Sequence, residues 1–323
     1  MPKHYLAFWN VENLFDIEDH PDRSDKLRRT LGRELNGWTQ DVLDAKIAQL
    51  ASIILQMNGG DGPDILGVCE VENRHVLELL RDALAPLGRN YGIAHEDAKD
   101  RRGVDVAFFY DAERYEIRDK EIFSHFIVRR SATRDLLQVN LRTKPEGRLL
   151  VVIGNHWPAR SAGQLESAPY RAMAAETLSY FHDRIRDIHG KDAAVVALGD
   201  FNDEPFDRSL TGYALSESQA EKVRNANSPR MLNLMWPALG AAVGTQYHDN
   251  KAHVLDQFLV SKGLVTGKSG LRALTDTAEV VRIPEMVSRG RYPKPKRFGR
   301  GRHLDLAGYS DHFPIGVVIE EDD

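Results

Sequence analysis

The sequence predicts an α+β fold in which mixed β-sheets are covered on the outside by helices. Short apolar runs typical of strands recur along the 323 residues, and helical patterns separate only some of them. Other runs follow each other directly, as where Lys-Pro-Glu-Gly at 144–147 marks the turn of a hairpin. Helical crossovers and hairpins in one chain indicate sheets with both parallel and antiparallel neighbours.

Three segments have the apolar period of a helix. Thr39 is the expected N-cap of a helix whose apolar positions recur up to Ile54. Further helices are expected at 73–84 and 166–188, while the charged stretch 16–38 is typical of a surface excursion. The expected strands lie at 5–9, 64–69, 104–110, 123–128, 136–141, 149–153, 193–198, 254–260 and 315–319.

The composition is that of one globular domain spanning residues 1–323. Hydrophobic residues make up 42% of the chain, enough for a large core, and no linker-like segment divides it. A net charge of -5 argues against a generic nucleic-acid coat protein, but a local basic patch remains compatible with it. The single cysteine, Cys69, excludes an intramolecular disulfide. Without a signal-peptide segment or a membrane-spanning run, we expect a soluble, cytoplasmic protein with no obligate protein partner.

Polar side chains gather where the apolar strands are expected to end. Burying such groups is costly unless they pair with one another or bind a metal. Six segments and one further carboxylate share this placement. They are Asn10, Glu70 with Glu72, Asp105, Asn155 with His156, Asp200 with Asn202, Asp311 with His312, and Asp256.

The donors in this set are mainly oxygen atoms. Such a set favours a hard cation, Mg²⁺, Mn²⁺ or Ca²⁺, whereas zinc prefers more histidine or cysteine. His156 and His312 can contact a phosphate or act as a base, and neighbouring carboxylates can fix their tautomers. The pattern therefore indicates metal-assisted chemistry on a phosphate ester.

Six short motifs follow one another along the chain. They are Trp-Asn-Val-Glu-Asn at 9–13, Gly-Val-Cys-Glu-Val at 67–71, Asn-His at 155–156, Gly-Asp-Phe-Asn at 199–202, Leu-Asp-Gln-Phe at 255–258 and Ser-Asp-His at 310–312. In this order, residues 8–319 resemble the endonuclease/exonuclease/phosphatase superfamily of metal-dependent phosphoesterases. The resemblance implies a four-layer α-β-β-α sandwich of two mixed sheets, with the active site at one end.

The resemblance also implies metal ligands and a catalytic pair. Glu70 would be the central metal ligand, with Asn10 and Asp311 beside it. His312 would activate water or contact the scissile phosphate, and Asp256 would orient it.

Further roles follow from the same resemblance. Asp200 and Asn202 would position the nucleophile and the phosphate, although a simple Asx turn is the alternative for this pair. His156 would donate a hydrogen bond to a phosphate oxygen, oriented by Asp105. Gln257 stands where many relatives carry an aromatic residue, a departure that should affect packing and not chemistry. Two residues after the expected metal ligand, Glu72 is expected to cap the following helix.

The segment 289–303 is basic and rich in glycine and proline. It leads into the Ser-Asp-His motif and has neither a helical nor a strand period. We interpret it as a loop that tracks phosphates, in which Tyr292 and Phe298 can stack on bases; the alternative is a solvated connection. The residues expected to bind substrate are Arg160, Lys294, Lys296 and Arg297.

The sequence therefore predicts a divalent-metal-dependent hydrolase of phosphodiester bonds. The favoured activity is that of an endonuclease on DNA or RNA, with Mg²⁺ or Mn²⁺ as cofactor and Ca²⁺ as a further candidate. The alternative is a phosphatase or phosphodiesterase acting on a small molecule, a phosphoinositide or a lipid headgroup. A catalytically inactive binding module is disfavoured, because every motif position holds a chemically competent residue.

Overall fold

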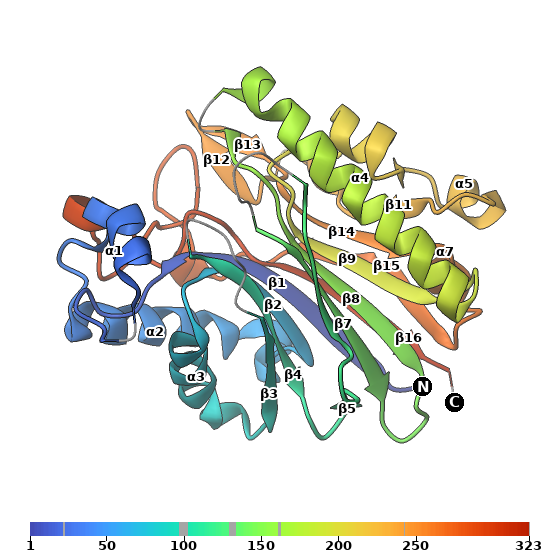
Figure 1. Cartoon of the computed structure of the whole chain (residues 1–323), viewed down its shortest axis with the longest axis horizontal. Coiled ribbons are helices and arrows are strands. Elements are labelled where there is room, and N and C mark those ends of the chain that lie inside the picture. Colours follow the sequence, from blue (N-terminus) through green and yellow to red (C-terminus); the bar gives the residue numbers. More distant parts are fainter. Residues whose placement is uncertain (22, 97–102, 129–133, 161–162, 242, 323) are drawn as a thin grey trace.

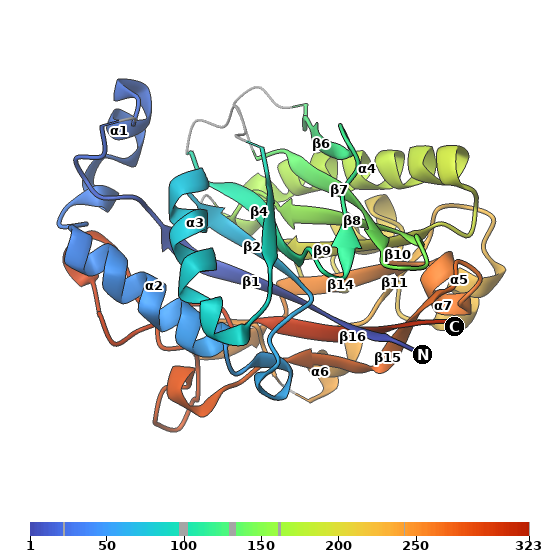
Figure 2. The same cartoon turned by 90° about the horizontal axis from the view of Figure 1, so that it is seen from below.

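Two β-sheets face each other and carry helices on their outer sides, as Figure 1 and Figure 2 show for the computed structural model. The structure describes residues 1–21, 23–96, 103–128, 134–160, 163–241 and 243–322. Helices α2 (Gln40–Ile54) and α3 (Arg74–Ala83) cover one sheet, and the long α4 (Gln164–His189) covers the other. This arrangement confirms the predicted four-layer α-β-β-α sandwich.

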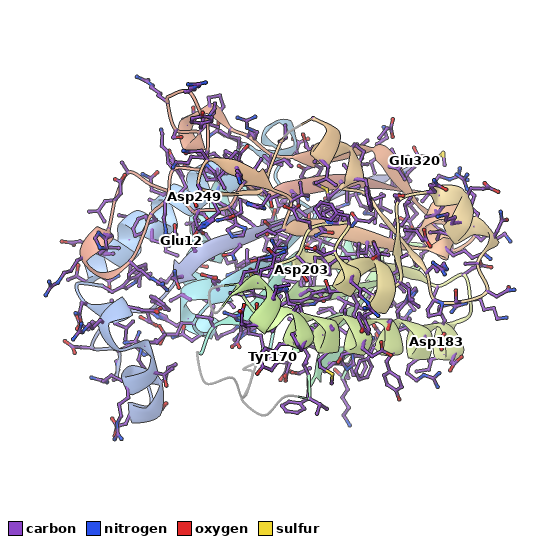
Figure 3. All side chains as sticks on the ribbon, turned by 90° about the horizontal axis from the view of Figure 1, so that it is seen from above. Glu12, Tyr170, Asp183, Asp203, Asp249 and Glu320 are labelled. Atoms are coloured by element: carbon purple, nitrogen blue, oxygen red, sulfur yellow. The ribbon has the colours of Figure 1, made fainter. Side chains whose placement is uncertain are left out.

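Sheet A contains the first and the last strand. Its order is β15 (Leu271–Val280), β16 (Ile315–Glu321), β1 (Lys3–Leu14), β2 (Ile65–Val71), β4 (Asp105–Asp111) and β3 (Tyr91–His95). β1 runs parallel to β2, because α2 returns the chain to the same end, and antiparallel to β16. Figure 3 shows Glu12 of β1 and Glu320 of β16 toward opposite ends of this sheet.

Sheet B is also mixed. Its order is β10 (Ser216–Glu217), β11 (Met231–Asn233), β14 (Asp256–Ser261), β9 (Ala194–Asp200), β8 (Leu149–His156), β7 (Leu136–Thr143) and β5 (Tyr115–Glu116), and β6 (Ile122–His125) also pairs with β7. The predicted turn at 144–147 joins β7 to β8, and α4 makes the crossover between the parallel strands β8 and β9.

The remaining elements are short. β12 (Gln246–His248) and β13 (Lys251–His253) form a separate hairpin, and the other helices are α1 (Asp25–Leu31), α5 (Ala220–Asn225), α6 (Trp236–Gly240) and α7 (Lys262–Thr266). Single turns lie at η1 (Gly32–Leu35), η2 (Met57–Gly60), η3 (Ala85–Leu87), η5 (Ser209–Tyr213), η6 (Pro284–Met286) and η7 (Gly301–His303). Within the described ranges, no helix is both long and apolar enough to cross a bilayer.

Alternating side chains of the strands build the layers. On β1, Leu6 and Phe8 pack between the two sheets, whereas Ala7 and Trp9 pack on the helix side of sheet A. A third apolar cluster joins the outer face of sheet B to α4. Because successive side chains of a strand point to opposite faces, a nearly continuous apolar sequence can serve two cores at once.

The expectation that Glu72 caps the following helix is wrong. Asn73 caps α3, with its side chain accepting a hydrogen bond from the backbone of Val76 at 3.0 Å. Glu72 instead forms a buried ion pair with Arg23, whose Nε lies 2.6 Å from Glu72 Oε1. Glu72 Oε2 also accepts the backbone N–H of Asp16 at 2.8 Å, so this carboxylate anchors the segment that follows β1.

The predicted surface excursion 16–38 is more ordered than its charge suggested. It contains α1 and ends at Trp38, which is fully buried and donates its indole N–H to the backbone oxygen of Phe15 at 2.8 Å. Thr39 is the N-cap of α2 as predicted, although its side chain forms no capping hydrogen bond. The strand expected at 254–260 begins at Asp256, so this carboxylate opens β14 and does not lie inside it.

Candidate active site

Three of the predicted site residues lie side by side at one edge of sheet B. Asp200, the last residue of β9, pairs in register with His156 on β8 and with Asp256 on β14. β8 and β9 are parallel and end together, whereas β14 is antiparallel and begins there. Strand polarity alone therefore places an imidazole and two carboxylates next to each other.

Sheet A supplies its part of the site through irregular backbone. The register between β1 and β2 shifts after Asn10, and the register between β2 and β4 shifts after Cys69. Glu12, Asn13 and Glu70 have positive φ values of 50°, 55° and 66°, in the left-handed region that non-glycine residues rarely adopt. Bulges re-aim side chains, and backbone strain of this kind concentrates at functional sites.

Asn10 connects the two sheets. Its Nδ2 donates to Asp200 Oδ2 at 3.1 Å and to Glu70 Oε1 at 3.4 Å. The backbone N–H of Asn13 holds Glu70 Oε2 at 3.0 Å. His156 Nε2 lies 3.6 Å from Glu70 Oε1 and 3.9 Å from Asp200 Oδ2. Glu70, the predicted metal ligand, therefore lies beside His156 and Asp200, the residues predicted to contact or position the phosphate.

His312 and Asp256 form a buried pair. His312 Nδ1 lies 2.7 Å from Asp256 Oδ2, and the backbone around the imidazole is fixed by Trp9, whose Nε1 donates to His312 O at 2.9 Å. Ser310 Oγ accepts the backbone N–H of His312 at 3.1 Å. With Nδ1 held by Asp256, Nε2 is directed toward Asp200, whose Oδ2 lies 4.0 Å away.

Negative charge is concentrated in this space. Burial raises the pKa of Asp200 to about 7, and repulsion by Asp256 adds to that rise while the His312 imidazole opposes it. Burial lowers the pKa of His312, but Asp256 and Asp200 outweigh that effect and raise the pKa well above its usual value. The site therefore favours a positively charged imidazole and stabilises any further cation.

A cavity of about 610 Å³ opens over these residues. Its walls include nine of the predicted site residues: Asn10, Glu70, His156, Arg160, Asp200, Asn202, Arg297, Asp311 and His312. Asp256 lies behind His312, whereas Lys294 is exposed and Lys296 donates to a backbone oxygen of Glu285, both away from the cavity wall. Arg300 of the basic segment and the buried Arg134 join the wall instead.

Asn202 and Arg160 form one structure beside Asp200. Asp200 Oδ1 accepts the backbone N–H of Asn202 at 2.9 Å, so the Asx turn considered as an alternative is present. Asn202 Nδ2 donates to Trp157 O at 3.0 Å, and Asn202 O accepts Arg160 Nε at 2.6 Å. Arg160 is further held by Asp207 at 2.7 Å. The turn thus fixes the carboxylate and a guanidinium at the cavity wall together.

One expectation about neighbouring residues changes, and one stays a prediction. Phe298 cannot offer a base a stacking surface, because it is fully buried with its ring centroid 5.8 Å from that of Trp38; Tyr292 is exposed. Asp105 is held 3.3 Å from His95 Nε2 on the neighbouring strand β3, and its role toward His156 stays a prediction.

Lys46 is a site neighbour that the sequence analysis missed. It lies on the buried face of α2 between Leu43 and Ile47, and its Nζ donates to Tyr309 O at 2.6 Å. Burial lowers the pKa of Lys46 to about 8, although Glu12 and Asp311 favour its charged form. A lysine within an apolar helical stripe was the signal that could have found it.

Glu12 was likewise quoted only as part of a motif. It is buried, forms an ion pair with Arg297, and accepts the backbone N–H of Phe298 at 3.0 Å. Arg297 Nη2 also lies 3.5 Å from Asp311 Oδ2. The basic segment is therefore attached to the site through Arg297.

The residues present fit a hard divalent cation. Glu70 and Asp311 offer carboxylate oxygens at the cavity wall, and Asn10 offers an amide beside them. Asp200, Asp256 and His312 form a second, buried group whose ligand atoms lie within 4.8 Å of one another. Oxygen donors with excess negative charge suit Mg²⁺, Mn²⁺ or Ca²⁺ better than zinc.

Known proteins share this architecture. The human nocturnin catalytic domain with bound sulfate superposes with a TM-score of 0.54 at 16% identity, covering 99% of this chain and 94% of that chain. A mannosyl-6-phosphatase of Bacteroides thetaiotaomicron gives 0.54 at 15% identity, with 98% and 99% covered. The 2',3'-cyclic phosphatase ANGEL2 with adenosine-2',3'-vanadate gives 0.62 at 13%, with 99% and 96% covered.

Sequence comparison gives the family directly. No curated protein matches the chain significantly. The model of the Endonuclease/Exonuclease/phosphatase family, however, matches residues 5–321. The chain therefore belongs to the endonuclease/exonuclease/phosphatase family of phosphoesterases.

Proposed function

We propose that this protein is a divalent-metal-dependent phosphodiesterase whose preferred substrate is a nucleic acid. The observation that carries the proposal is the meeting of two groups in one cavity. Asn10, Glu70 and Asp200 are joined by hydrogen bonds, and the His312–Asp256 pair lies directly beside them. This combination offers cation ligands, a buried base and a fixed imidazole within reach of one phosphate group.

Each residue has a defined task in this proposal. Glu70, Asp311 and Asn10 would hold the cation, which when bound neutralises phosphate charge and lowers the pKa of water. Asp200 accepts the proton of the attacking water, because burial raises the pKa of its carboxylate to about 7. His312, kept protonated by Asp256 and Asp200, donates from Nε2 to a phosphate oxygen, and His156 donates to another.

Two observations favour a nucleic-acid substrate. Arg134, Arg160, Arg297 and Arg300 line the cavity beyond the carboxylates, so cationic groups extend past a single phosphate. ANGEL2 was solved with an adenosine-2',3'-vanadate, a nucleotide-like ligand on the same fold. The rival is a small phosphate ester, which the mannosyl-6-phosphatase on this fold supports.

An activity screen with matched substrates tests the proposal. The purified chain is incubated with Mg²⁺, Mn²⁺ or Ca²⁺ and, in parallel, with excess chelator. The substrates are supercoiled plasmid, single-stranded DNA, RNA, a chromogenic phosphodiester and a hexose 6-phosphate. Metal-dependent cleavage at internal positions of a nucleic-acid strand is expected. If only the hexose phosphate were hydrolysed, the substrate would be a small phosphate ester and not a nucleic acid. Full turnover in the presence of chelator would reject metal dependence.

A further inference from the structure

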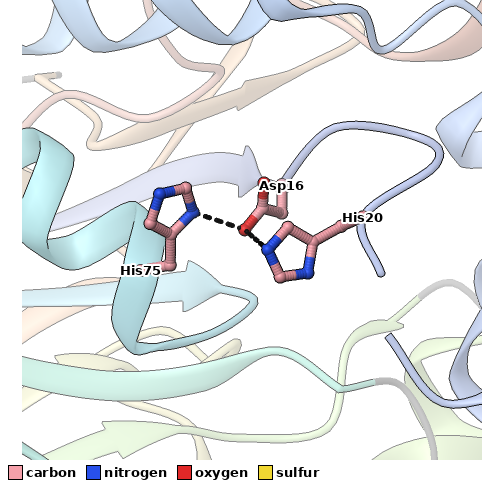
Figure 4. A group of neighbouring side chains, drawn as sticks. All are labelled: Asp16, His20 and His75. Atoms are coloured by element: carbon pink, nitrogen blue, oxygen red, sulfur yellow. Dashed lines mark hydrogen bonds and ion pairs between the residues drawn. The ribbon is translucent and has the colours of Figure 1, made fainter. Parts of the chain in front are cut away.

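A second group of metal-binding side chains lies outside the active-site cavity. Asp16 follows the end of β1, His20 lies four residues later in the same loop, and His75 is the second residue of α3. Asp16 Oδ2 lies 2.8 Å from His75 Nδ1 and 3.4 Å from His20 Nε2 (Figure 4). The three ligand atoms lie within 4.8 Å of one another, and none of these residues lines the cavity described above.

The carboxylate of Asp16 is held in place by its surroundings. Its Oδ1 accepts the backbone N–H of Ile17 at 2.8 Å, and its Oδ2 accepts Asn73 Nδ2 at 3.0 Å. Asn73 is itself fixed as the N-cap of α3. Hydrogen bonds of this kind orient the ligands of metal sites. The Asp16 carboxylate is therefore already held in a fixed orientation by its neighbours.

The distances suit a tetrahedral ion. Metal–ligand distances of about 2.0–2.1 Å to nitrogen and oxygen place neighbouring ligand atoms roughly 3.3 Å apart in a tetrahedron. The 3.4 Å separation of His20 Nε2 and Asp16 Oδ2 already matches this value. The 2.8 Å separation to His75 Nδ1 must lengthen by about 0.5 Å to reach the same geometry. The His75 side chain is 51% exposed and so has room to rotate by that amount.

The two imidazoles face each other beside the carboxylate. The rings of His20 and His75 stack with centroids 5.5 Å apart and planes 25° apart. A metal ion uses the lone pairs of neutral imidazoles and at the same time neutralises the Asp16 carboxylate.

We propose that Asp16, His20 and His75 form a second metal site, which takes a zinc-class cation with water as the fourth ligand. Two imidazoles and one carboxylate are a zinc-type donor set, unlike the oxygen-rich set around Glu70. The ion joins the segment after β1 to the start of α3. It therefore stabilises the folded chain by RT ln(1 + [L]/Kd), where [L] is the free ion concentration.

Zinc titration of the full chain tests this site. Metal-stripped protein is titrated with Zn²⁺ by calorimetry and with Co²⁺ by visible absorption, which reports nitrogen-containing tetrahedral coordination. The His75→Gln variant changes a half-exposed residue and should fold; it is expected to bind at least about tenfold more weakly and to lose the zinc-dependent rise in Tm. The exposed His189→Gln variant is the matched control and should behave as wild type.

The Glu70→Gln variant distinguishes metal binding at the active site from metal binding at the Asp16–His20–His75 site. That variant should keep the Co²⁺ spectrum and the zinc-dependent rise in Tm, because Glu70 is not a ligand of the proposed ion. Circular dichroism checks that each variant is folded. Equal zinc affinity in wild type and His75→Gln, or no zinc binding at micromolar concentration, would overturn the proposal and leave a hydrogen-bonded His–Asp–His group only.

Discussion

Asn10 Nδ2 and Asp200 Oδ2 are joined by a hydrogen bond of 3.1 Å, and these residues belong to different sheets. Asn10 lies where β1 leaves its regular pairing with β2, whereas Asp200 ends β9. The candidate active site is therefore divided between the two sheets. Its geometry depends on how the sheets pack, as well as on the side chains within each one.

Glu70→Gln should abolish metal-stimulated hydrolysis without unfolding the protein. The amide keeps the shape of the side chain but removes the charge that would bind the cation. Hydrolysis is measured across Mg²⁺ and Mn²⁺ titrations, with circular dichroism as the check on folding. Glu78→Gln, a change at a half-exposed side chain of α3, is the control and should keep full activity. Wild-type metal stimulation in Glu70→Gln would remove this residue from the metal site.

His312→Ala and Asp256→Asn should show non-additive losses. His312→Ala should lower kcat/KM by roughly 10³-fold or more, and Asp256→Asn by less, because the two residues act as one unit. The double variant should then be no worse than His312→Ala alone. Losses that multiply in the double-mutant cycle would mean that the 2.7 Å contact between these side chains has no catalytic role.

Lys294 and Lys296 of the basic segment should contribute to the binding of long substrates but not to hydrolysis in the cavity. Replacing Lys294 and Lys296 with alanine should weaken nucleic-acid binding and flatten its salt dependence by about one to two in log–log slope. Hydrolysis of a small chromogenic phosphodiester should stay unchanged, because neither lysine lines the cavity.

Arg297→Ala should behave differently from the lysine pair. Arg297 contacts Glu12 and Asp311, so its loss should reduce hydrolysis of small and long substrates alike. If the double lysine variant showed the same salt dependence of nucleic-acid binding as wild type, the segment would be a solvated connection only. A small phosphate ester would then be the better substrate candidate.

His182 should make the protein less stable in acid. This residue of α4 is buried and donates from Nδ1 to Pro229 O at 3.1 Å, and burial lowers its pKa from 6.5 to about 4. Between those values the unfolded chain binds a proton that the folded chain does not. Stability therefore falls as pH drops through this window, by up to about 3 kcal/mol from this group.

Denaturant unfolding at pH 7, 5.5 and 4.5 checks this contribution. His182→Gln should flatten the dependence of unfolding free energy on pH, even if it lowers stability at neutral pH. His189→Gln, at the exposed end of the same helix, should flatten it less, because that imidazole is less buried although burial also lowers its pKa. Parallel curves for wild type and His182→Gln would contradict the assignment.

The strand-end residues of the site were predictable because their positions follow from short sequence patterns. An apolar run that stops at Asp200 or Glu70 marks a strand end, and parallel strands end together. The sequence also showed Lys46 as a charged residue in an apolar helical stripe. Its hydrogen-bond partner, the backbone oxygen of Tyr309, could not be predicted from that pattern.

The missed contacts depend on pairings distant in sequence. Glu12 and Arg297 are separated by 285 positions, so no local pattern links them. The same holds for Glu72, which pairs with Arg23 where its position beside a helix suggested a cap. The register shifts next to Glu12 and Glu70 could not be predicted from strand periodicity either, because a bulge breaks the period of two.

The pairing of β1 with β16 has a consequence for biosynthesis. Tyr5 of the first strand pairs with Val318 of the last, so β1 emerges from the ribosome long before its neighbour exists. Until then β1 presents an open edge on that side, and such edges invite aggregation. Contacts this distant in sequence also slow folding. A nascent chain stalled before residue 310 is therefore expected to lack protease resistance in β1, and resistance there would contradict this order of folding.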